Sequence, residues 1–209
     1  MEAVDWKTTF DRIREMADAR GLAPDPDEWR GVKRERLRQL EVDPDHERLV
    51  LVSPACPALL THKGSVDAAK AAEAFVRDGL LRLLVLGGPT GRGKTVTATW
   101  LAATLDACRW LSAKDVRVGD AWSQTQPKAA RAAVLIVDDL GHEASEWAHK
   151  ELSALLESRF DKGYRSIVTT NLPPAAFTKT YGDRLASRLE KPGRGLYVLC
   201  GGADLRSGK

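Results

Sequence analysis

Residues 83–100, with the sequence LLVLGGPTGRGKTVTATW, constrain the fold more than any other part of this 209-residue chain. Four aliphatic residues run into a cluster of glycines and then into a helix-like pattern, which predicts a buried strand, a tight loop and a helix. The loop matches the pattern G-x-x-x-x-G-K-[ST] between a strand and a helix, the context that makes such a match credible. Glycines let this kind of loop curl until backbone N–H groups point at phosphate oxygens. The stretch therefore predicts a phosphate-binding loop.

The residues of this loop have distinct expected tasks. Lys94 can reach the β- and γ-phosphates of ATP, and the Thr95 hydroxyl is placed to ligate Mg²⁺. A glycine-rich turn without a ligand is the alternative, and the complete pattern in its context disfavours it. The residues expected to bind the nucleotide are Gly88, Pro89, Thr90, Gly91, Arg92, Gly93, Lys94, Thr95 and Val96.

A second apolar run, AAVLIVDD at residues 132–139, ends in two acids. We expect Asp138 to hold the Mg²⁺ shell and Asp139 to polarise the attacking water. Two acids at the end of a buried strand could instead cap the next loop, but the neighbouring phosphate-binding loop makes the metal role the preferred interpretation. Asn171, at the end of the following strand, could orient that water or sense the γ-phosphate, or it could form a turn before two prolines.

Two arginines in the segment YGDRLASRLEK, Arg184 and Arg188, are four residues apart and share one helical face. We expect both guanidinium groups to project together. An arginine delivered to the γ-phosphate of a neighbouring subunit accelerates hydrolysis by about 10³ to 10⁵ where this has been assessed. Surface salt bridging is the alternative, and for this pair in isolation it would be the better interpretation.

Strands and helices alternate from residue 66 onwards. Strands that are hydrophobic on both faces indicate a mostly parallel sheet covered by helices, so the expected fold class is α/β, a P-loop NTPase. The predicted helices span residues 66–78, 94–106, 145–160 and 181–190, and the predicted strands span residues 81–86, 109–111, 132–139, 164–171 and 195–200.

The first 40 residues carry two amphipathic helix patterns, and prolines interrupt the segment that follows. The first helix is marked by Trp6, Phe10, Ile13 and Ala17, and one face of the second by Trp29, Val32, Leu37 and Leu40. The second helix also carries Arg30, Lys33, Arg34 and Arg38. These basic residues form either a solvated face of a small bundle or a surface that docks a partner or contacts DNA. We expect a helical partner-docking region and linker over residues 1–64 and an ATPase domain over residues 65–209.

Composition excludes several classes of protein. No apolar run approaches the roughly 18 to 20 residues of a membrane helix, and the charged N-terminus is unlike a secretory signal, so we expect a cytoplasmic protein without a membrane partner. Cys56, Cys108 and Cys200 are scattered, and His46, Cys56 and His62 match no standard metal site. A net charge of +3 is too small to demonstrate nucleic-acid binding by itself.

Five segments together resemble the DnaC/IstB-like branch of the AAA+ ATPases: GGPTGRGKT, VLIVDDLGHEASEWAHKELSALLESRF, IVTTNLP, YGDRLASRL and LCGGADLR. Their order and spacing extend the resemblance over residues 66–206. It implies an AAA+ core with Asn171 as sensor 1, Arg188 as the arginine finger and Arg184 as a neighbouring or second contact. Members of this family are typically helicase loaders or transposition helpers that oligomerise on DNA. The resemblance therefore also implies ATP, self-association through the ATP sites, a replicative helicase and single-stranded DNA.

Three features depart from the family pattern. Residues 112–132 look shorter than the family segment whose helices line a pore around single-stranded DNA. Their basic residues are Lys114, Arg117, Lys128 and Arg131. The chain ends soon after its last strand, so we expect no full helical lid, and Arg206 is a weak substitute for the sensor 2 arginine. The N-terminal cysteine cluster of some loaders is absent from this sequence.

Three functions stay open on the sequence alone. The leading hypothesis is an ATP-dependent loader that delivers a replicative helicase to single-stranded DNA. The second is a transposition helper ATPase that assembles on duplex DNA. The third is a nucleotide-gated binding module with little hydrolysis, because Asp139 stands where a glutamate is more usual and a shorter carboxylate must be positioned differently. A small-molecule kinase is disfavoured, since the sequence has no arginine-rich lid or acceptor-pocket signature.

Overall fold

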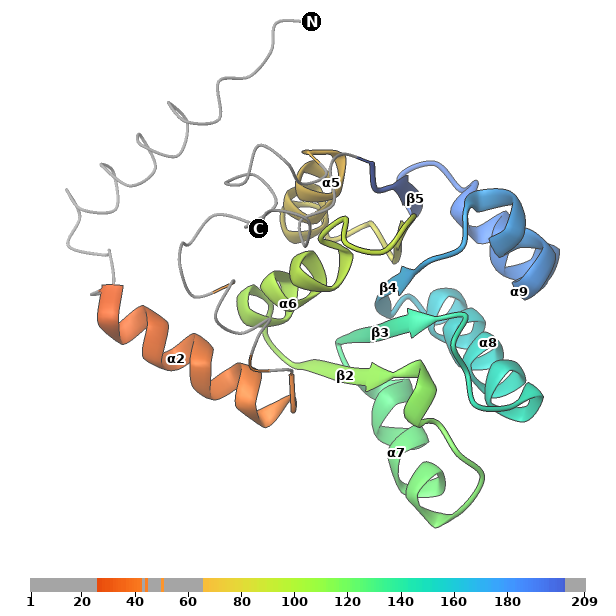
Figure 1. Cartoon of the computed structure of the whole chain (residues 1–209), viewed down its shortest axis with the longest axis horizontal. Helices are drawn as coiled ribbons and strands as arrows, with labels where there is room; N and C mark the ends of the chain where they lie inside the picture. The colour runs from red at the N-terminus through yellow and green to blue at the C-terminus, as the bar shows by residue number, and fades with distance from the viewer. Residues whose placement is uncertain (1–25, 43, 45–49, 51–65, 202–209) are drawn as a thin grey trace, which may run out of the picture.

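A computed structural model describes residues 26–42, 44, 50 and 66–201, and its centre is a five-stranded parallel sheet (Figure 1). The strand order is β2-β3-β4-β1-β5, and every pair of neighbours is parallel. The strands are β1 (Leu83–Gly87), β2 (Cys108–Ser112), β3 (Val134–Leu140), β4 (Arg165–Thr170) and β5 (Gly195–Leu199). The helices are α2 (Pro26–Gln39), α5 (Val66–Arg77), α6 (Lys94–Thr104), α7 (Asp120–Arg131), α8 (Glu146–Asp161) and α9 (Pro174–Leu189), and Ala113–Asp115 form a short 3-10 helix.

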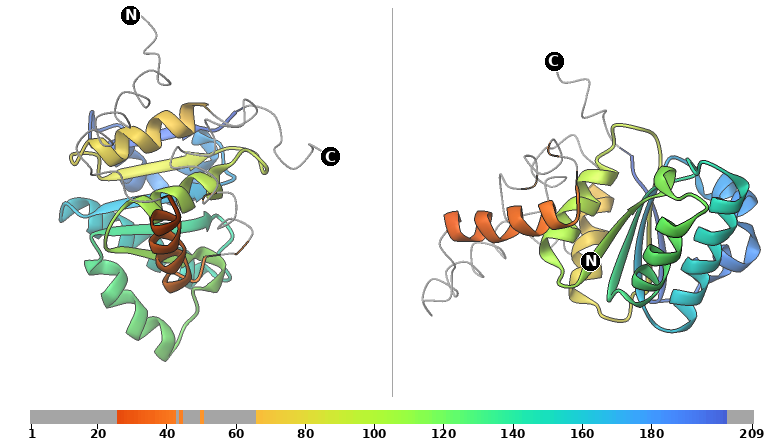
Figure 2. Two further views of the ribbon diagram at one scale, coloured as in Figure 1. Left: turned by 90° about the vertical axis from the view of Figure 1, so that its left-hand side faces the viewer. Right: turned by 90° about the horizontal axis from the view of Figure 1, so that it is seen from below.

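Helices cover both faces of the sheet (Figure 2). α5 and α6 pack on one face, and α7, α8 and α9 pack on the other. Strands covered on both sides must be apolar throughout, and β1 is buried at every residue. Because all five strands run in the same direction, their carboxyl ends meet at one edge, which is where open α/β sheets bind their ligands.

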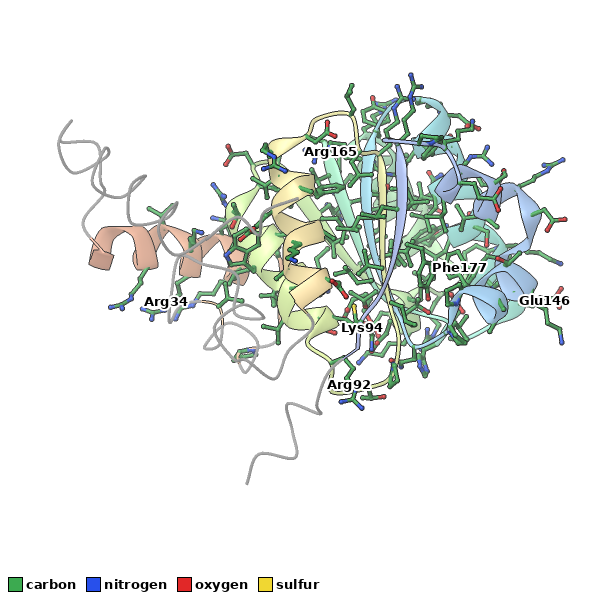
Figure 3. The ribbon with its side chains drawn as sticks, turned by 90° about the horizontal axis from the view of Figure 1, so that it is seen from above. Arg34, Arg92, Lys94, Glu146, Arg165 and Phe177 are labelled. Atoms are coloured by element: carbon green, nitrogen blue, oxygen red, sulfur yellow. The ribbon has the colours of Figure 1, made fainter. Side chains whose placement is uncertain are left out.

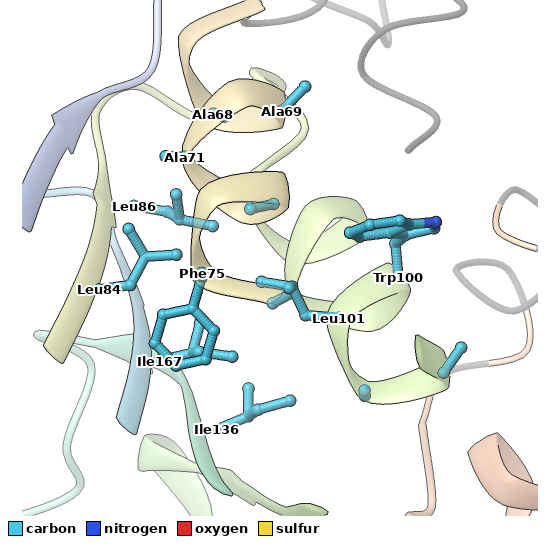
Figure 4. Close-up of a cluster of buried hydrophobic side chains, with 14 of the residues drawn as sticks. Ala68, Ala69, Ala71, Phe75, Leu84, Leu86, Trp100, Leu101, Ile136 and Ile167 are labelled. Atoms are coloured by element: carbon cyan, nitrogen blue, oxygen red, sulfur yellow. The ribbon is translucent and has the colours of Figure 1, made fainter. Parts of the chain in front are cut away.

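The core between the sheet and α6 holds the first strand and the helix after it in a fixed relation (Figure 4). Leu84 and Leu86 of β1 and Ile167 of β4 lie in the same cluster as Phe75 of α5 and Leu101 of α6, and all five side chains are fully buried. Burying a side chain of this size stabilises the fold by about 1.5–3 kcal/mol. This packing therefore fixes both ends of the loop that joins β1 to α6.

The core on the opposite face contains a buried charge. Arg159 of α8 is 1% exposed, and its guanidinium donates hydrogen bonds to the carbonyl oxygens of Ala129 (2.6 Å), Ala130 (3.1 Å) and Arg165 (2.5 Å) and to the hydroxyl of Ser166 (3.0 Å). Burial lowers the pKa of Arg159 to about 10. Because the first two carbonyls lie in the last turn of α7, this side chain ties α7 to the start of β4.

Two helices differ from the sequence-based expectation. The sequence pattern does not predict the helix α7. Pro127 inside it is a signal against a helix, and its buried residues, Trp122 and Ala129, are too few to form a clear apolar periodicity. α9 begins at Pro174, well before the predicted start, and Gly182 divides it with φ 77° and ψ 168°. The predicted helix is therefore the second half of α9. The other predicted helices and strands of the ATPase domain are confirmed, with ends shifted by two residues or fewer.

α2 packs against the C-terminus of α6 and confirms the second predicted N-terminal helix (Figure 2). Leu37 is fully buried, whereas Val32 is 58% exposed, so the predicted apolar face is turned inward only in part. Arg36 donates to the carbonyl oxygen of Ala103 at 3.1 Å and pairs with Asp106 at 2.6 Å. The Arg36 guanidinium therefore gives a partner to a carbonyl group in the last turn of α6, where the helix itself supplies none.

Some sequence-based expectations lie outside the described residues. These are the first N-terminal helix, the residues His46, Cys56 and His62, and Arg206. Among the helices that the structure describes, none combines the length and the apolar character that a membrane span requires.

Candidate nucleotide-binding site

A cavity of about 550 Å³ opens at the carboxyl edge of the sheet. Figure 3 shows Lys94 and Arg92 at this end of the sheet and Arg165 at the opposite end. The predicted site residues that line the cavity are Thr90, Gly91, Arg92, Gly93, Lys94, Thr95, Val96, Asp138, Asp139 and Asn171. The fold thus brings three separate sequence motifs, at the carboxyl ends of β1, β3 and β4, into one cavity.

The base of the phosphate-binding loop is closed by β5, and this contact requires glycine at two positions. A Cβ atom on Gly87 would lie 1.8 Å from the hydroxyl oxygen of Tyr197, which donates a hydrogen bond to the carbonyl of Leu172. A Cβ atom on Gly88 would lie 2.7 Å from the carbonyl oxygen of Cys200, and Gly88 has φ 126°. Both residues therefore allow a close approach of β5 that side chains would block.

Lys94 is folded into the loop and is 6% exposed. Its ammonium donates hydrogen bonds to the carbonyl oxygens of Gly88 and Pro89, both at 2.8 Å, and to Oδ1 of Asn171 at 2.9 Å. Phosphate oxygens form stronger, charge-assisted bonds with an ammonium than neutral carbonyl oxygens do. The lysine is therefore held where it could exchange its carbonyl partners for phosphates.

A single threonine organises the two acids at the end of β3. The Thr169 hydroxyl donates to Oδ1 of Asp138 at 2.6 Å, and its oxygen accepts the backbone N–H of Asp139 at 2.9 Å. Asp139 itself has φ 56°, a left-handed conformation that non-glycine residues seldom adopt. It lies in an irregular part of β3, where the pairing with β4 shifts register between Val137 and Leu140. Strain of this kind is typical of functional sites, which supports the assignment of the two acids to the site.

Asn171 links the loop to a residue that the motif analysis does not single out. Its Nδ2 lies 3.1 Å from Nε2 of His142, while its Oδ1 accepts the bond from Lys94. Lys94, Asn171 and His142 therefore form one chain of hydrogen bonds along the cavity wall.

The residues of the cavity match the chemistry of ATP and magnesium. The loop presents backbone N–H groups and Lys94, and Thr95 and Asp138 offer the oxygen ligands that Mg²⁺ prefers. No group of three His, Cys, Asp or Glu side chains within the described ranges could hold a metal ion by itself. A cation here would therefore need phosphate and water oxygens as well, which is how Mg²⁺ is usually bound.

Arg184 and Arg188 lie on α9, across the sheet from α6 and its loop (Figure 2). Arg188 donates to both carboxylate oxygens of Asp161, at 3.2 and 2.5 Å, and lies 3.9 Å from Glu157. Arg184 is exposed and lines a second cavity with Glu157. The expectation that both guanidinium groups project together toward a neighbouring subunit stays a prediction, and within one copy Arg188 turns onto α8. Arg188 forms a salt bridge with Asp161, which agrees with the alternative interpretation of these arginines as surface ion pairs.

Sequence reasoning missed several residues that line the cavity: Glu41, Trp110, Ser112, Asp115 and His142. Glu41 reaches the cavity from the turn after α2, which no local pattern indicates. Ser112 is the last residue of β2 and Asp115 lies in the 3-10 helix after it, so the position of that predicted strand could have indicated both. Lys114, considered in relation to a DNA pore, also lines this cavity.

No protein-family model matches the sequence, and no curated protein matches it. Solved structures do match. A DnaC helicase loader has a TM-score of 0.53 and 21% identity over 66% of this chain and 94% of that chain. DnaI has a TM-score of 0.52 and 20% identity over 65% and 84% of the two chains.

A replication initiator DnaA, bound to AMPPCP and single-stranded DNA, matches with a TM-score of 0.51 and 20% identity over 63% of this chain. The protein has the AAA+ P-loop fold. The resemblance read from the motifs is confirmed at the level of the fold. The chain covers 44% of the length of the DnaA chain, less than half of it. Identities this low show the fold alone, so activity and partners must be argued from the site and tested by experiment.

Proposed function

We propose that the protein is an ATP-dependent helicase loader of DNA replication, which binds ATP and Mg²⁺ and delivers a replicative helicase to single-stranded DNA. The proposal of ATP hydrolysis rests on one observation: Lys94, Asp138 and Asn171 line the same cavity at the carboxyl edge of the sheet. The helicase part is supported by the likeness in fold to the DnaC helicase loader, nearly all of whose chain is covered. The DnaA neighbour bound to single-stranded DNA supports the nucleic-acid part.

In the proposed reaction Lys94 leaves the loop carbonyls and binds the β- and γ-phosphates of ATP. Thr95 and Asp138 would hold a magnesium ion, which would supply positive charge that stabilises the transition state. Thr169 keeps the Asp138 carboxylate fixed for that task. Asp139 accepts a hydrogen bond from the attacking water and polarises it.

The proposed site is completed by a second copy of the chain. Arg188 belongs to α9, on the other face of the sheet from α6, and its guanidinium is bound to Asp161, so we propose that it reaches the γ-phosphate of a neighbouring subunit. We propose a division into residues 1–64, which dock the helicase, and residues 65–209, which form the ATPase domain.

The ATPase proposal is tested by calorimetry and by phosphate release with purified protein, MgATP and the variant Lys94→Ala. The wild type should bind and hydrolyse ATP, and Lys94→Ala should bind it at least about tenfold more weakly, because a charge-assisted contact to the phosphates is lost. Lys70→Ala, at an exposed position of α5, is the control and should match the wild type. Absence of ATP uptake by the wild type with magnesium present would contradict the proposal.

The docking proposal needs point variants, because a deletion of residues 1–40 would remove Leu37 from the core. Val32 is exposed on α2, and Val118 is equally apolar and 72% exposed on a distant segment. Val32→Asp should abolish capture of the replicative helicase of the same cell, whereas Val118→Asp should retain it. Equal capture by both variants would refute docking through α2. Filaments on duplex DNA without helicase affinity would favour the transposition helper instead.

A further inference from the structure

The hydrogen-bond chain from Lys94 to His142 fixes the direction in which the Asn171 amide points. An ammonium has donors only, so the amide atom that faces Lys94 must be the oxygen. The amide nitrogen then faces His142, and because NH₂ is a donor, Nε2 of His142 must accept. The imidazole is therefore neutral, with its proton on Nδ1.

The turn that carries His142 is built to keep the ring in place. The backbone N–H of His142 donates to the carbonyl of Asp139 at 3.1 Å, and Gly141 donates to Oε1 of Glu143 at 3.0 Å. The Glu143 side chain is only 7% exposed and accepts a 2.6 Å bond from the Tyr181 hydroxyl. Three separate bonds thus hold the turn between β3 and α8, so His142 is presented to the cavity by a fixed backbone.

We propose that His142 is a positioning residue for ATP hydrolysis, acting through Asn171. His142 holds the amide nitrogen, so the amide oxygen stays directed toward the phosphate-binding loop. When Lys94 moves to the phosphates, that oxygen loses its donor and becomes an acceptor for a proton of the attacking water. The water is then oriented with a lone pair toward the γ-phosphate. This inference rests on the proposed ATPase function, and it assigns to that reaction a residue outside the recognised motifs.

The positioning role of His142 is tested by steady-state kinetics of the wild type, His142→Ala and His142→Gln. His142→Ala should lower kcat about tenfold, since a free amide samples other orientations, while the dissociation constant for a non-hydrolysable ATP analogue should change by less than about twofold. His142→Gln offers an acceptor oxygen near the place of Nε2 and should restore kcat to within about threefold of the wild type. A His142→Ala enzyme with wild-type kcat, or a Gln variant as slow as the Ala variant, would overturn the inference.

The tautomer of His142 tests the same contact without any nucleotide. In ¹⁵N NMR spectra of the whole protein at pH 8, His142 should carry its proton on Nδ1, and Asn171→Ala should allow the two tautomers to mix. A proton on Nε2 in the wild type, or spectra that do not respond to Asn171→Ala, would overturn the inference. The two proposals fail differently. A wild type that takes up no ATP contradicts both, whereas a wild type that hydrolyses ATP with a His142 proton on Nε2 contradicts this inference alone.

Discussion

Lys33 of α2 shows how a single residue can weaken the contact between the N-terminal helix and the ATPase domain. Its ammonium lies 3.3 Å from the Thr104 hydroxyl at the end of α6, close to Arg36. Burial, and then the charge of Arg36, lowers the pKa of Lys33 from 10.5 to about 8. Below pH 8 the side chain is charged in both the folded and the unfolded protein, and the folded protein bears the full desolvation cost.

Lys33→Met should therefore stabilise the protein at pH 7, because methionine keeps the apolar stem and removes the charge. Between pH 8 and pH 10.5 the unfolded wild type binds more protons than the folded one, so the free energy of unfolding of the wild type rises with pH. After discounting for solvent screening we expect a gain of about 1 kcal/mol at pH 7, which disappears near pH 10.5. Denaturant unfolding at both pH values measures it, with Lys70→Met as an exposed control. A gain that is equal at both pH values would contradict the explanation.

The residues of the site differ in how far the sequence reveals them. Lys94, Thr95 and Asp138 belong to motifs whose spacing is set by phosphate and metal chemistry, so their assembly in one cavity could be predicted. Thr169 and His142 act through contacts between segments about 30 residues apart, and no local pattern encodes such a contact. Their roles become visible only when β3 and β4 are placed side by side.

At the scale of whole elements, α7 depends on one side chain from another helix. Its C-terminal carbonyls at Ala129 and Ala130 accept hydrogen bonds from Arg159 of α8. Local signals for this helix are weak, since Pro127 interrupts it and its mean hydropathy is low. The sequence therefore predicts α8 correctly but leaves α7 out, because the interaction that secures α7 comes from tertiary structure.

Arg159→Met should destabilise the protein by about 3 kcal/mol or more, because backbone carbonyls that cannot move away lose their donors. For a domain of this size that corresponds to a fall in Tm of roughly 6–12 °C. Amide exchange in α7 should increase before exchange in the sheet does. Calorimetry and hydrogen exchange measure both effects, with Arg131→Met at an exposed position of α7 as control. A Tm within about 2 °C of the wild type would show that methionine packing replaces the lost hydrogen bonds.

At the scale of the whole molecule, the two halves of the proposed site lie on opposite faces of the sheet. The phosphate-binding loop precedes α6 on one face, and α9, the helix that carries Arg188, lies on the other (Figure 2). Such a separation suits a head-to-tail arrangement, in which the arginine face of one copy meets the loop face of the next. Within one copy the Arg188 guanidinium is bound to Asp161 and lowers the pKa of that carboxyl. A neighbouring triphosphate would have to compete with this ion pair.

The variants Lys94→Ala and Arg188→Ala should complement each other if sites form between copies. Each alone should hydrolyse ATP very slowly, but an equimolar mixture should recover about a quarter of wild-type turnover, because random head-to-tail assembly joins an intact loop to an intact arginine at one interface in four. Asp161→Asn breaks the same ion pair and keeps the guanidinium, so it separates loss of the ion pair from loss of the arginine and should retain turnover. Phosphate release is measured for the two single variants, for their mixture and for Asp161→Asn. A mixture that hydrolyses no faster than the average of its two components would place the arginine outside the site, and Arg188 would then serve only to join α9 to α8.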